Sequence, residues 1–143
     1  LAAIEAVRPG IPYTLVHDVA VKVLAEGLVR LGLIAGPTEA ALEQGSYKAY
    51  YMHRTSHWLG MDVHDVGDYF TDKKPRLLEP GMVLTVEPGL YIGQEAECDP
   101  AYRGIGVRIE DDIAVTATGY RNLTQDIPKS AVDLERILTA RAA

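Results

Sequence analysis

The segment YMHRTSHWLGMDVHDVG, residues 51–67, is the stretch around which the rest of the chain is organised. It contains His53, His57 and His64, three of the four histidines in the chain. Their spacing would place all three on one face of a helix. Two glycines, and the alternation of apolar and polar residues over 61–64, argue against a helix. We therefore predict irregular backbone that leads into a short strand, with the histidines placed for metal binding or proton transfer.

The bulk composition fits one soluble globular domain, predicted over residues 1–143, with 48% apolar and 24% charged residues. A net charge of −6 argues against nucleic acid or an anionic membrane as partner, because either would favour a basic surface. No apolar run approaches the roughly 20 residues that span a bilayer. Cys98 is the only cysteine, so no intrachain disulfide can form. We predict an inert thiol and a reducing, cytoplasmic location.

Helical periodicity flanks the histidine segment on its N-terminal side. Apolar spacing predicts a helix over about residues 15–31 and a shorter one over 38–44. His17 falls on the polar side of the longer helix, and we predict that it is solvated at the surface. Near the C-terminus, Ser130 followed by Asp133 resembles a capping box and predicts the start of another helix.

Strand patterns follow the histidine segment. Composition predicts strands at residues 82–87, 90–92 and 104–110, with 113–116 as a hairpin or continuation partner of the last. The polar stretch 68–76 is predicted to be a loop. This mixture of helices and strands indicates an α/β or α+β domain.

Two glutamates lie on strands that are otherwise apolar. Alternation places Glu87 on one face with Val83 and Thr85, while Glu110 shares a face with Arg108. Burying an unpaired carboxylate costs several kcal/mol or more, so each glutamate is expected to have a cation nearby. A salt bridge to Arg108 and a metal site are both consistent with the strand pattern.

The nearby histidines favour the metal. One or two imidazoles beside two carboxylates suit manganese, cobalt, iron or zinc. A carboxylate can bridge two ions, and paired ions activate water and polarise a scissile carbonyl. The remaining histidines could donate hydrogen bonds to a developing oxyanion or shuttle protons. The predicted reaction class is metal-assisted hydrolysis.

Five ordered motifs resemble the Xaa-Pro aminopeptidase (aminopeptidase P) family, whose superfamily includes prolidase, methionine aminopeptidase and creatinase. The motifs occupy residues 51–53, 56–60, 62–67, 78–91 and 104–112. The resemblance implies an α+β class with the "pita-bread" fold, an antiparallel curved sheet covered by helices.

The resemblance also implies roles for individual residues. His57 and Glu87 match metal ligands, and Glu110 matches the carboxylate that bridges two metal ions. Manganese is the metal implied as cofactor.

Three further residues match positions around the metals. His53 and His64 match histidines that contact the substrate and stabilise the tetrahedral intermediate, and Arg108 matches the arginine that orders the site. The implied substrate is a peptide with proline at its second position, from which the N-terminal residue is released.

The chain departs from the family pattern in one respect. The family uses five side-chain ligands, two of them aspartates upstream of the histidine, but Asp18 is the only aspartate before His57. We therefore expect residues 1–143 to be a C-terminal fragment of the catalytic domain, without the N-terminal domain and first catalytic strands. The start of the chain at Leu1, within an apparent helix, fits this expectation. Such a fragment is expected to bind metal weakly or not at all, to lack peptidase activity alone, and to form a homo-oligomer through its open sheet edge.

Two alternatives to an aminopeptidase follow from the same motifs. A prolidase shares nearly all of them but cleaves only dipeptides. A non-catalytic pita-bread binding module would keep the surface without the metals. The presence of three matched ligands, together with His53, His64 and Arg108, argues against the binding module.

Overall fold

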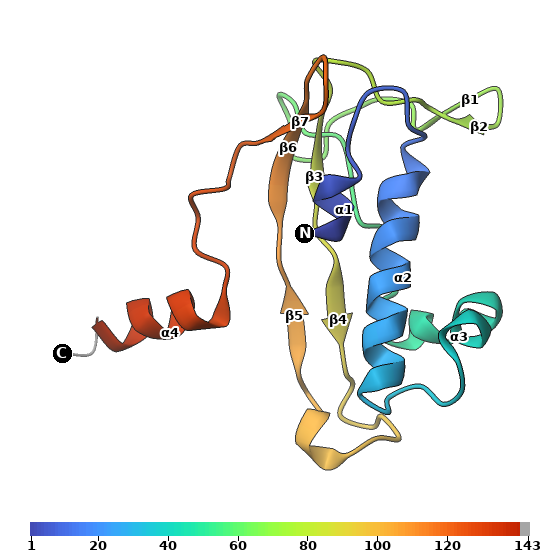
Figure 1. The fold of residues 1–143 in the computed structure, drawn as a ribbon, viewed down its shortest axis with the longest axis vertical. Helices are drawn as coiled ribbons and strands as arrows, with labels where there is room; N and C mark the ends of the chain where they lie inside the picture. Colours follow the sequence, from blue (N-terminus) through green and yellow to red (C-terminus); the bar gives the residue numbers. More distant parts are fainter. Residues whose placement is uncertain (141–143) are drawn as a thin grey trace.

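Two long stretches of extended chain run antiparallel through the middle of the molecule (Figure 1). The first is β3 (Val83–Val86) followed by β4 (Gly89–Tyr91), and the second is β5 (Gly106–Arg108) followed by β6 (Asp111–Val115). β3 pairs with β6, and β4 pairs with β5. This computed structural model describes residues 1–140, so the last three residues of the predicted 1–143 unit lie outside the described part.

Both stretches are interrupted at the same level. The β3–β6 ladder ends with Val86 opposite Asp111, and the β4–β5 ladder resumes at Gly89 in unchanged register. The intervening proline cannot donate a backbone hydrogen bond. Because the register is the same on both sides, Glu87 and Glu110 occupy opposite positions at the interruption.

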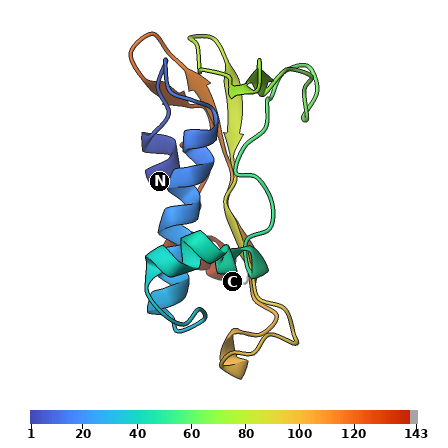
Figure 2. The same cartoon turned by 90° about the vertical axis from the view of Figure 1, so that its right-hand side faces the viewer.

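Helices α1 (Ala2–Glu5) and α2 (Thr14–Arg30) form a layer beside these strands, as the turned view in Figure 2 shows. α3 (Thr38–Gln44) and the 3-10 helix η1 (Ser46–Ala49) follow. The two helices predicted here are confirmed to within one residue at each end. No helix in the described part of the chain is both long enough and apolar enough to cross a membrane.

The main core lies between this helical layer and the β3–β6 ladder. Its centre consists of side chains that are at most 1% exposed: Val7, Val16, Leu78, Leu84 and Ile113. Burying each side chain of this size contributes about 1.5–3 kcal/mol. A second cluster joins the end of α2, through Leu28, to Ile92 just beyond β4. The two clusters fix both ends of the strands against α2.

Some strands were not predicted. β7 (Tyr120–Asn122) adds a third strand beside β6. β1 (Phe70–Thr71) and β2 (Lys74–Pro75) form a short hairpin, so the prediction of a loop throughout this region is wrong. Its turn residues, Asp72 and Lys73, have φ of 50° and 63°. Positive φ at both positions is the geometry of tight hairpin turns, which glycine and asparagine usually supply.

The start of the last helix agrees with its sequence signal. α4 (Ala131–Ala140) begins after Ser130, whose Oγ accepts from the Asp133 N–H at 3.1 Å and donates to its Oδ2 at 2.7 Å. The predicted capping motif is therefore confirmed. α4 has no buried residue and stands apart from the strands in Figure 1. The 3-10 helix η2 (Pro100–Tyr102) lies in the connection between β4 and β5.

Backbone pairing with a strand occurs earlier in the histidine segment than predicted. The Thr85 N–H donates to the His57 carbonyl at 3.0 Å, and the Glu87 N–H donates to the Thr55 carbonyl at 2.7 Å. Residues 61–64, where a strand was predicted, form exposed bends instead. The prediction was wrong because alternation over four residues does not identify a partner strand, and β3 lies beside the preceding residues.

The prediction that His17 is a solvated surface residue is also wrong. Its side chain is half-buried, with Nδ1 2.9 Å from Thr55 Oγ1 and the ring packed against Tyr51. Burial, followed by the charge of Arg54, lowers the pKa of His17. The polar face of α2 is therefore covered here by the histidine segment, an arrangement that helical periodicity alone does not reveal.

Candidate metal centre

The three predicted metal ligands converge. His57, Glu87 and Glu110 each offer one ligand atom, and these atoms all lie within 4.8 Å of one another. His57 comes from the segment beside β3, Glu87 follows β3, and Glu110 precedes β6. Residues separated by more than 50 positions in the sequence thus meet at the strand interruption.

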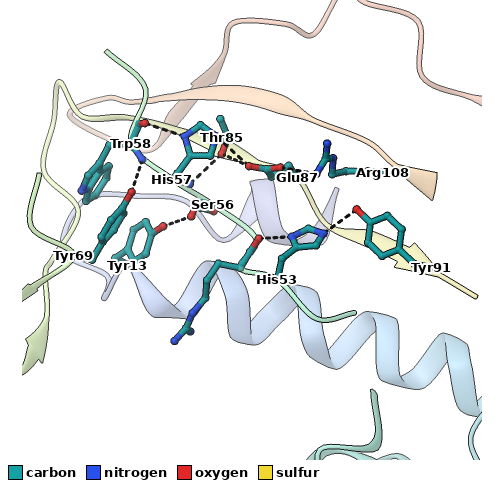
Figure 3. A network of polar contacts seen from close by, with 11 residues as sticks. Tyr13, His53, Ser56, His57, Trp58, Tyr69, Thr85, Glu87, Tyr91 and Arg108 are labelled. Carbon is teal, nitrogen blue, oxygen red and sulfur yellow. Dashed lines mark hydrogen bonds and ion pairs between the residues drawn. The ribbon is translucent and has the colours of Figure 1, made fainter. Parts of the chain in front are cut away.

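The orientation of His57 is fixed by the backbone. Its Nδ1 lies 2.9 Å from the Trp58 carbonyl oxygen, which can only accept, so Nδ1 carries the hydrogen (Figure 3). Nε2 then faces Glu87, with 3.1 Å between Nε2 and Oε1. A neutral imidazole held in this way presents its Nε2 lone pair as a metal ligand.

The short contact between His57 and Glu87 requires a proton or a cation between the two side chains. A neutral Nε2 and a carboxylate oxygen are both acceptors, so a separation of 3.1 Å between them is favourable only with a shared proton or a cation held by both atoms. The two side chains are only 15% and 12% exposed, which limits screening by water.

Glu87 is held on both of its oxygens. Thr85 Oγ1 donates to Oε1 at 3.2 Å and itself accepts from the His57 N–H at 3.1 Å. Arg108 Nη1 lies 3.8 Å from Oε2, so the predicted Glu87–Arg108 salt bridge is present beside the ligand cluster. Thr85 is 1% exposed, and its hydroxyl links the histidine backbone to the carboxylate.

Glu110 lies opposite Glu87 but is held differently. Its side chain is exposed, and within residues 1–140 neither a hydrogen bond nor an ion pair holds its carboxylate. Like charges directly opposite each other on neighbouring strands are destabilising. A cation shared by Glu87, Glu110 and His57 would relieve that repulsion.

The other two predicted histidines take separate positions. The His64 ring is exposed and lies edge-on to that of His57, with 4.4 Å between ring centroids. His53 Nδ1 is 2.8 Å from the Arg54 carbonyl, and its Nε2 is 2.9 Å from the Tyr91 hydroxyl (Figure 3). His64 therefore adjoins the ligand cluster, while His53 is directed toward β4.

Sequence reasoning missed two residues that support these groups. Thr85 was placed on the same strand face as Glu87, but no role was assigned to it. Tyr91 lies in a motif used for the family resemblance, and its contact with His53 depends on how β4 meets the histidine segment. Alternation could have pointed to Thr85, whereas no local signal points to Tyr91.

The likeness to known proteins agrees with this geometry. The chain is 49% identical over 133 residues to the Xaa-Pro aminopeptidase of Escherichia coli, which covers 93% of this chain and 30% of that protein. It resembles the structure of Pseudomonas aeruginosa aminopeptidase PepP with a TM-score of 0.94 and 47% identity, over 97% of this chain and 32% of the other. A structure of zinc-substituted E. coli aminopeptidase P in complex with product gives a TM-score of 0.89 at 47% identity, over 96% and 31% of the two chains.

These relatives confirm the predicted resemblance, the α+β class and the partial pita-bread fold. The chain spans about 30% of the length of the relatives it matches. A model of metallopeptidase family M24 matches residues 1–117, most of the chain and all three predicted metal ligands. The chain therefore belongs to metallopeptidase family M24.

Proposed function

We propose that the whole protein is a metal-dependent aminopeptidase that releases the N-terminal residue from peptides whose second residue is proline. The observation that carries the proposal is the convergence of His57, Glu87 and Glu110 within 4.8 Å. The names of the relatives supply the reaction and the Xaa-Pro specificity.

The donor set fits a divalent ion of the transition series. One imidazole nitrogen and two carboxylates suit manganese, cobalt, iron and zinc, and the Nε2 lone pair of His57 already faces the carboxylate of Glu87. We propose manganese as the resident metal. The E. coli relative has been described with zinc in substitution, and the experiment below therefore compares the two metals.

His57, Glu87 and Glu110 would hold the metal, with Glu110 as the carboxylate shared between two ions. Bound ions would polarise the scissile carbonyl and lower the pKa of the attacking water. Arg108 and Thr85 keep the Glu87 carboxylate in one orientation, because they contact different oxygens. We propose that residues 1–143 provide the C-terminal part of the catalytic domain and three of its side-chain ligands.

The accessory histidines would act on the substrate. His64 lies beside the imidazole of His57 and is exposed, so it can donate a hydrogen bond to the oxygen of a peptide carbonyl. His53 is held at both ring nitrogens, and the Tyr91 hydroxyl orients Nε2. We propose that both histidines orient the substrate and stabilise the oxyanion that develops during hydrolysis.

The test uses the whole protein, reconstituted with manganese and analysed for bound metal by mass spectrometry. Hydrolysis of Xaa-Pro-Yaa tripeptides, Xaa-Pro dipeptides and Xaa-Ala-Yaa controls is then compared. We expect at least one equivalent of manganese and cleavage of the Xaa-Pro-Yaa peptides, with the alanine controls left intact.

Each alternative has its own outcome in this test. Cleavage of dipeptides alone would replace the proposal with a prolidase. Less than one equivalent of metal after reconstitution, together with no hydrolysis, would favour a non-catalytic binding module. Activity with zinc but not with manganese would replace manganese by zinc in the proposal and leave the proposed reaction unaltered.

A further inference from the structure

The residue after Glu110 is fixed far more tightly than Glu110 itself. Asp111, the first residue of β6, is 6% exposed. Its Oδ1 accepts from Asn122 Nδ2 at 2.9 Å, from Thr124 Oγ1 at 2.8 Å and from Lys129 Nζ at 2.8 Å. Three side chains from the chain beyond β6 thus meet on one oxygen of a buried carboxylate.

Lys129 is fully engaged in this cluster. Besides its ion pair with Asp111, its Nζ donates to the Thr124 carbonyl at 2.6 Å and to the Ile127 carbonyl at 3.0 Å. An ammonium group has three hydrogens, and all three are used. The lysine therefore ties the segment between β7 and α4 to the start of β6.

Three of the four residues in this cluster lie beyond the part of the chain that the family model matches. Asn122, Thr124 and Lys129 follow residue 117, where the family match ends, whereas Asp111 and Glu110 lie within it. The connection that leads away from β7 returns to contact Asp111, the residue that follows Glu110. Residues beyond the family match thus support the position next to a candidate metal ligand.

Because of strand geometry, the position of Asp111 determines the position of Glu110. Successive side chains of an extended chain point to opposite faces. Asp111, with Val107 and Ile109, lines an apolar cavity of about 500 Å³ on one side of the strands, whereas Glu110 reaches the ligand cluster. Fixing Asp111 on its face fixes Glu110 on the other, because a slip of one residue would exchange the two.

We infer that Lys129 and Asp111 are positioning residues for Glu110, and that the Lys129–Asp111 anchor replaces the direct contacts that Glu87 has and Glu110 lacks. This inference rests on the proposed function. Loss of the anchor should loosen Glu110 within the metal site while leaving His57 and Glu87 in place, since their supports lie on the histidine segment, β3 and β5.

The experiment compares wild type with Lys129→Met in the whole protein. Manganese affinity is measured by titration calorimetry, and kcat by peptide hydrolysis at saturating metal, at temperatures where circular dichroism shows both proteins folded. We expect manganese to bind the variant about tenfold more weakly, at the lower end of the 10–100-fold effect of residues that support metal ligands. Lys129→Arg, which keeps the charge, should recover part of the affinity.

The matched control is Arg136→Met. It removes a cation from the same C-terminal region, where Arg136 pairs with Asp133 at 2.8 Å on an exposed face. Its manganese affinity and kcat should equal those of wild type. Asp111→Asn removes the negative charge that Lys129 pairs with but keeps an acceptor oxygen, so it gives a milder second variant in case Lys129→Met does not fold.

The outcomes separate the two proposals. A folded Lys129→Met, or failing that Asp111→Asn, with wild-type manganese affinity and kcat would overturn the anchor and leave the proposed function standing. A wild-type protein that binds no manganese and cleaves no peptide would overturn both.

Discussion

Glu87 and Glu110 occupy opposite positions on the same pair of strands, and their surroundings differ. Glu87 is 12% exposed and contacts Thr85, His57 and Arg108 directly. Glu110 is exposed, and the contacts near it belong to the next residue, Asp111, on the reverse face. One carboxylate is fixed through its own oxygens, and the other through the backbone that carries it.

The ligand cluster therefore contains one pair of side chains that is held by direct contacts and one carboxylate that is held only through its backbone. In the His57–Glu87 half, hydrogen bonds to Thr85 and to the Trp58 carbonyl fix the two side chains. The position of Glu110 toward that half depends on strand register, and its carboxylate keeps freedom to adjust. Such freedom suits a carboxylate that must accommodate more than one ion.

The largest effect is expected from deleting the bridging carboxylate. Glu110→Ala in the whole protein should abolish peptidase activity, because among residues 1–140 no other carboxylate joins His57 and Glu87 in the ligand cluster. Hydrolysis assays with metal analysis measure this. A mutant that is active and metal-replete would refute the bridging role.

The next effect concerns the direct support of Glu87. Thr85→Val should lower kcat/KM by about 10–100-fold, because the carboxylate loses a donor and the His57 N–H loses its acceptor. The unsatisfied buried N–H should also lower the free energy of unfolding by about 1–3 kcal/mol. Thr85→Ser keeps the hydroxyl and should stay close to wild type. Equal activity of the Val and Ser variants would contradict the role of the hydroxyl.

A smaller effect, of opposite sign, concerns stability without metal. In metal-free protein, Glu110→Gln should raise the free energy of unfolding by up to about 1 kcal/mol, because two like charges no longer face each other. Glu87→Gln should not share the gain, since it also removes the partner of Arg108 and His57. Chemical denaturation of the two variants in chelator measures both. If Glu110→Gln destabilised the metal-free protein, Glu110 would have a favourable contact that outweighs its repulsion from Glu87.

The smallest effect is the pH dependence set by His17. Its folded-state pKa lies below the ordinary value of 6.5, because burial and Arg54 disfavour the charged form, although Asp18 opposes them. The unfolded chain therefore binds the proton more readily. The stabilising contribution is complete above about pH 6.5 and is lost as the pH falls toward the lowered pKa.

Denaturation midpoints at pH 8, 7, 6 and 5 test this dependence. His17→Gln keeps a group that can hydrogen bond to Thr55 and has no titration, so its midpoints should vary less with pH than those of wild type. Parallel pH profiles for the two proteins would assign the dependence to other groups.

The elements that the sequence predicted well are those with local signals. Periodicity located α2 and α3, and the Ser130–Asp133 motif located the start of α4. The β1–β2 hairpin was missed because Asp72 and Lys73 are not typical residues for a turn with two positive φ values. Extended pairing of the histidine segment was placed too late because its partner, β3, lies some 25 positions away in the sequence.

For the site, too, residues in recognisable motifs were predicted, whereas contacts between distant parts of the chain were not. The family resemblance selected His57, Glu87 and Glu110, and the structure places them together. The supports of these residues depend on tertiary contacts: Thr85 with His57, Tyr91 with His53, and Lys129 with Asp111. The individual roles, the extent of the domain, the oligomeric state and the compartment stay predictions.

The unchanged register across the strand interruption has a consequence for how this protein can vary during evolution. Strands β4 and β5 are joined through residues 92–105, a connection that can lengthen or shorten without moving either glutamate. Adding two residues between Val86 and Gly89 would preserve the alternation of faces, yet it would displace the partners by about 7 Å along the strand. Homologous sequences should therefore differ in length in the connection between β4 and β5 and keep constant spacing around Glu87 and Glu110.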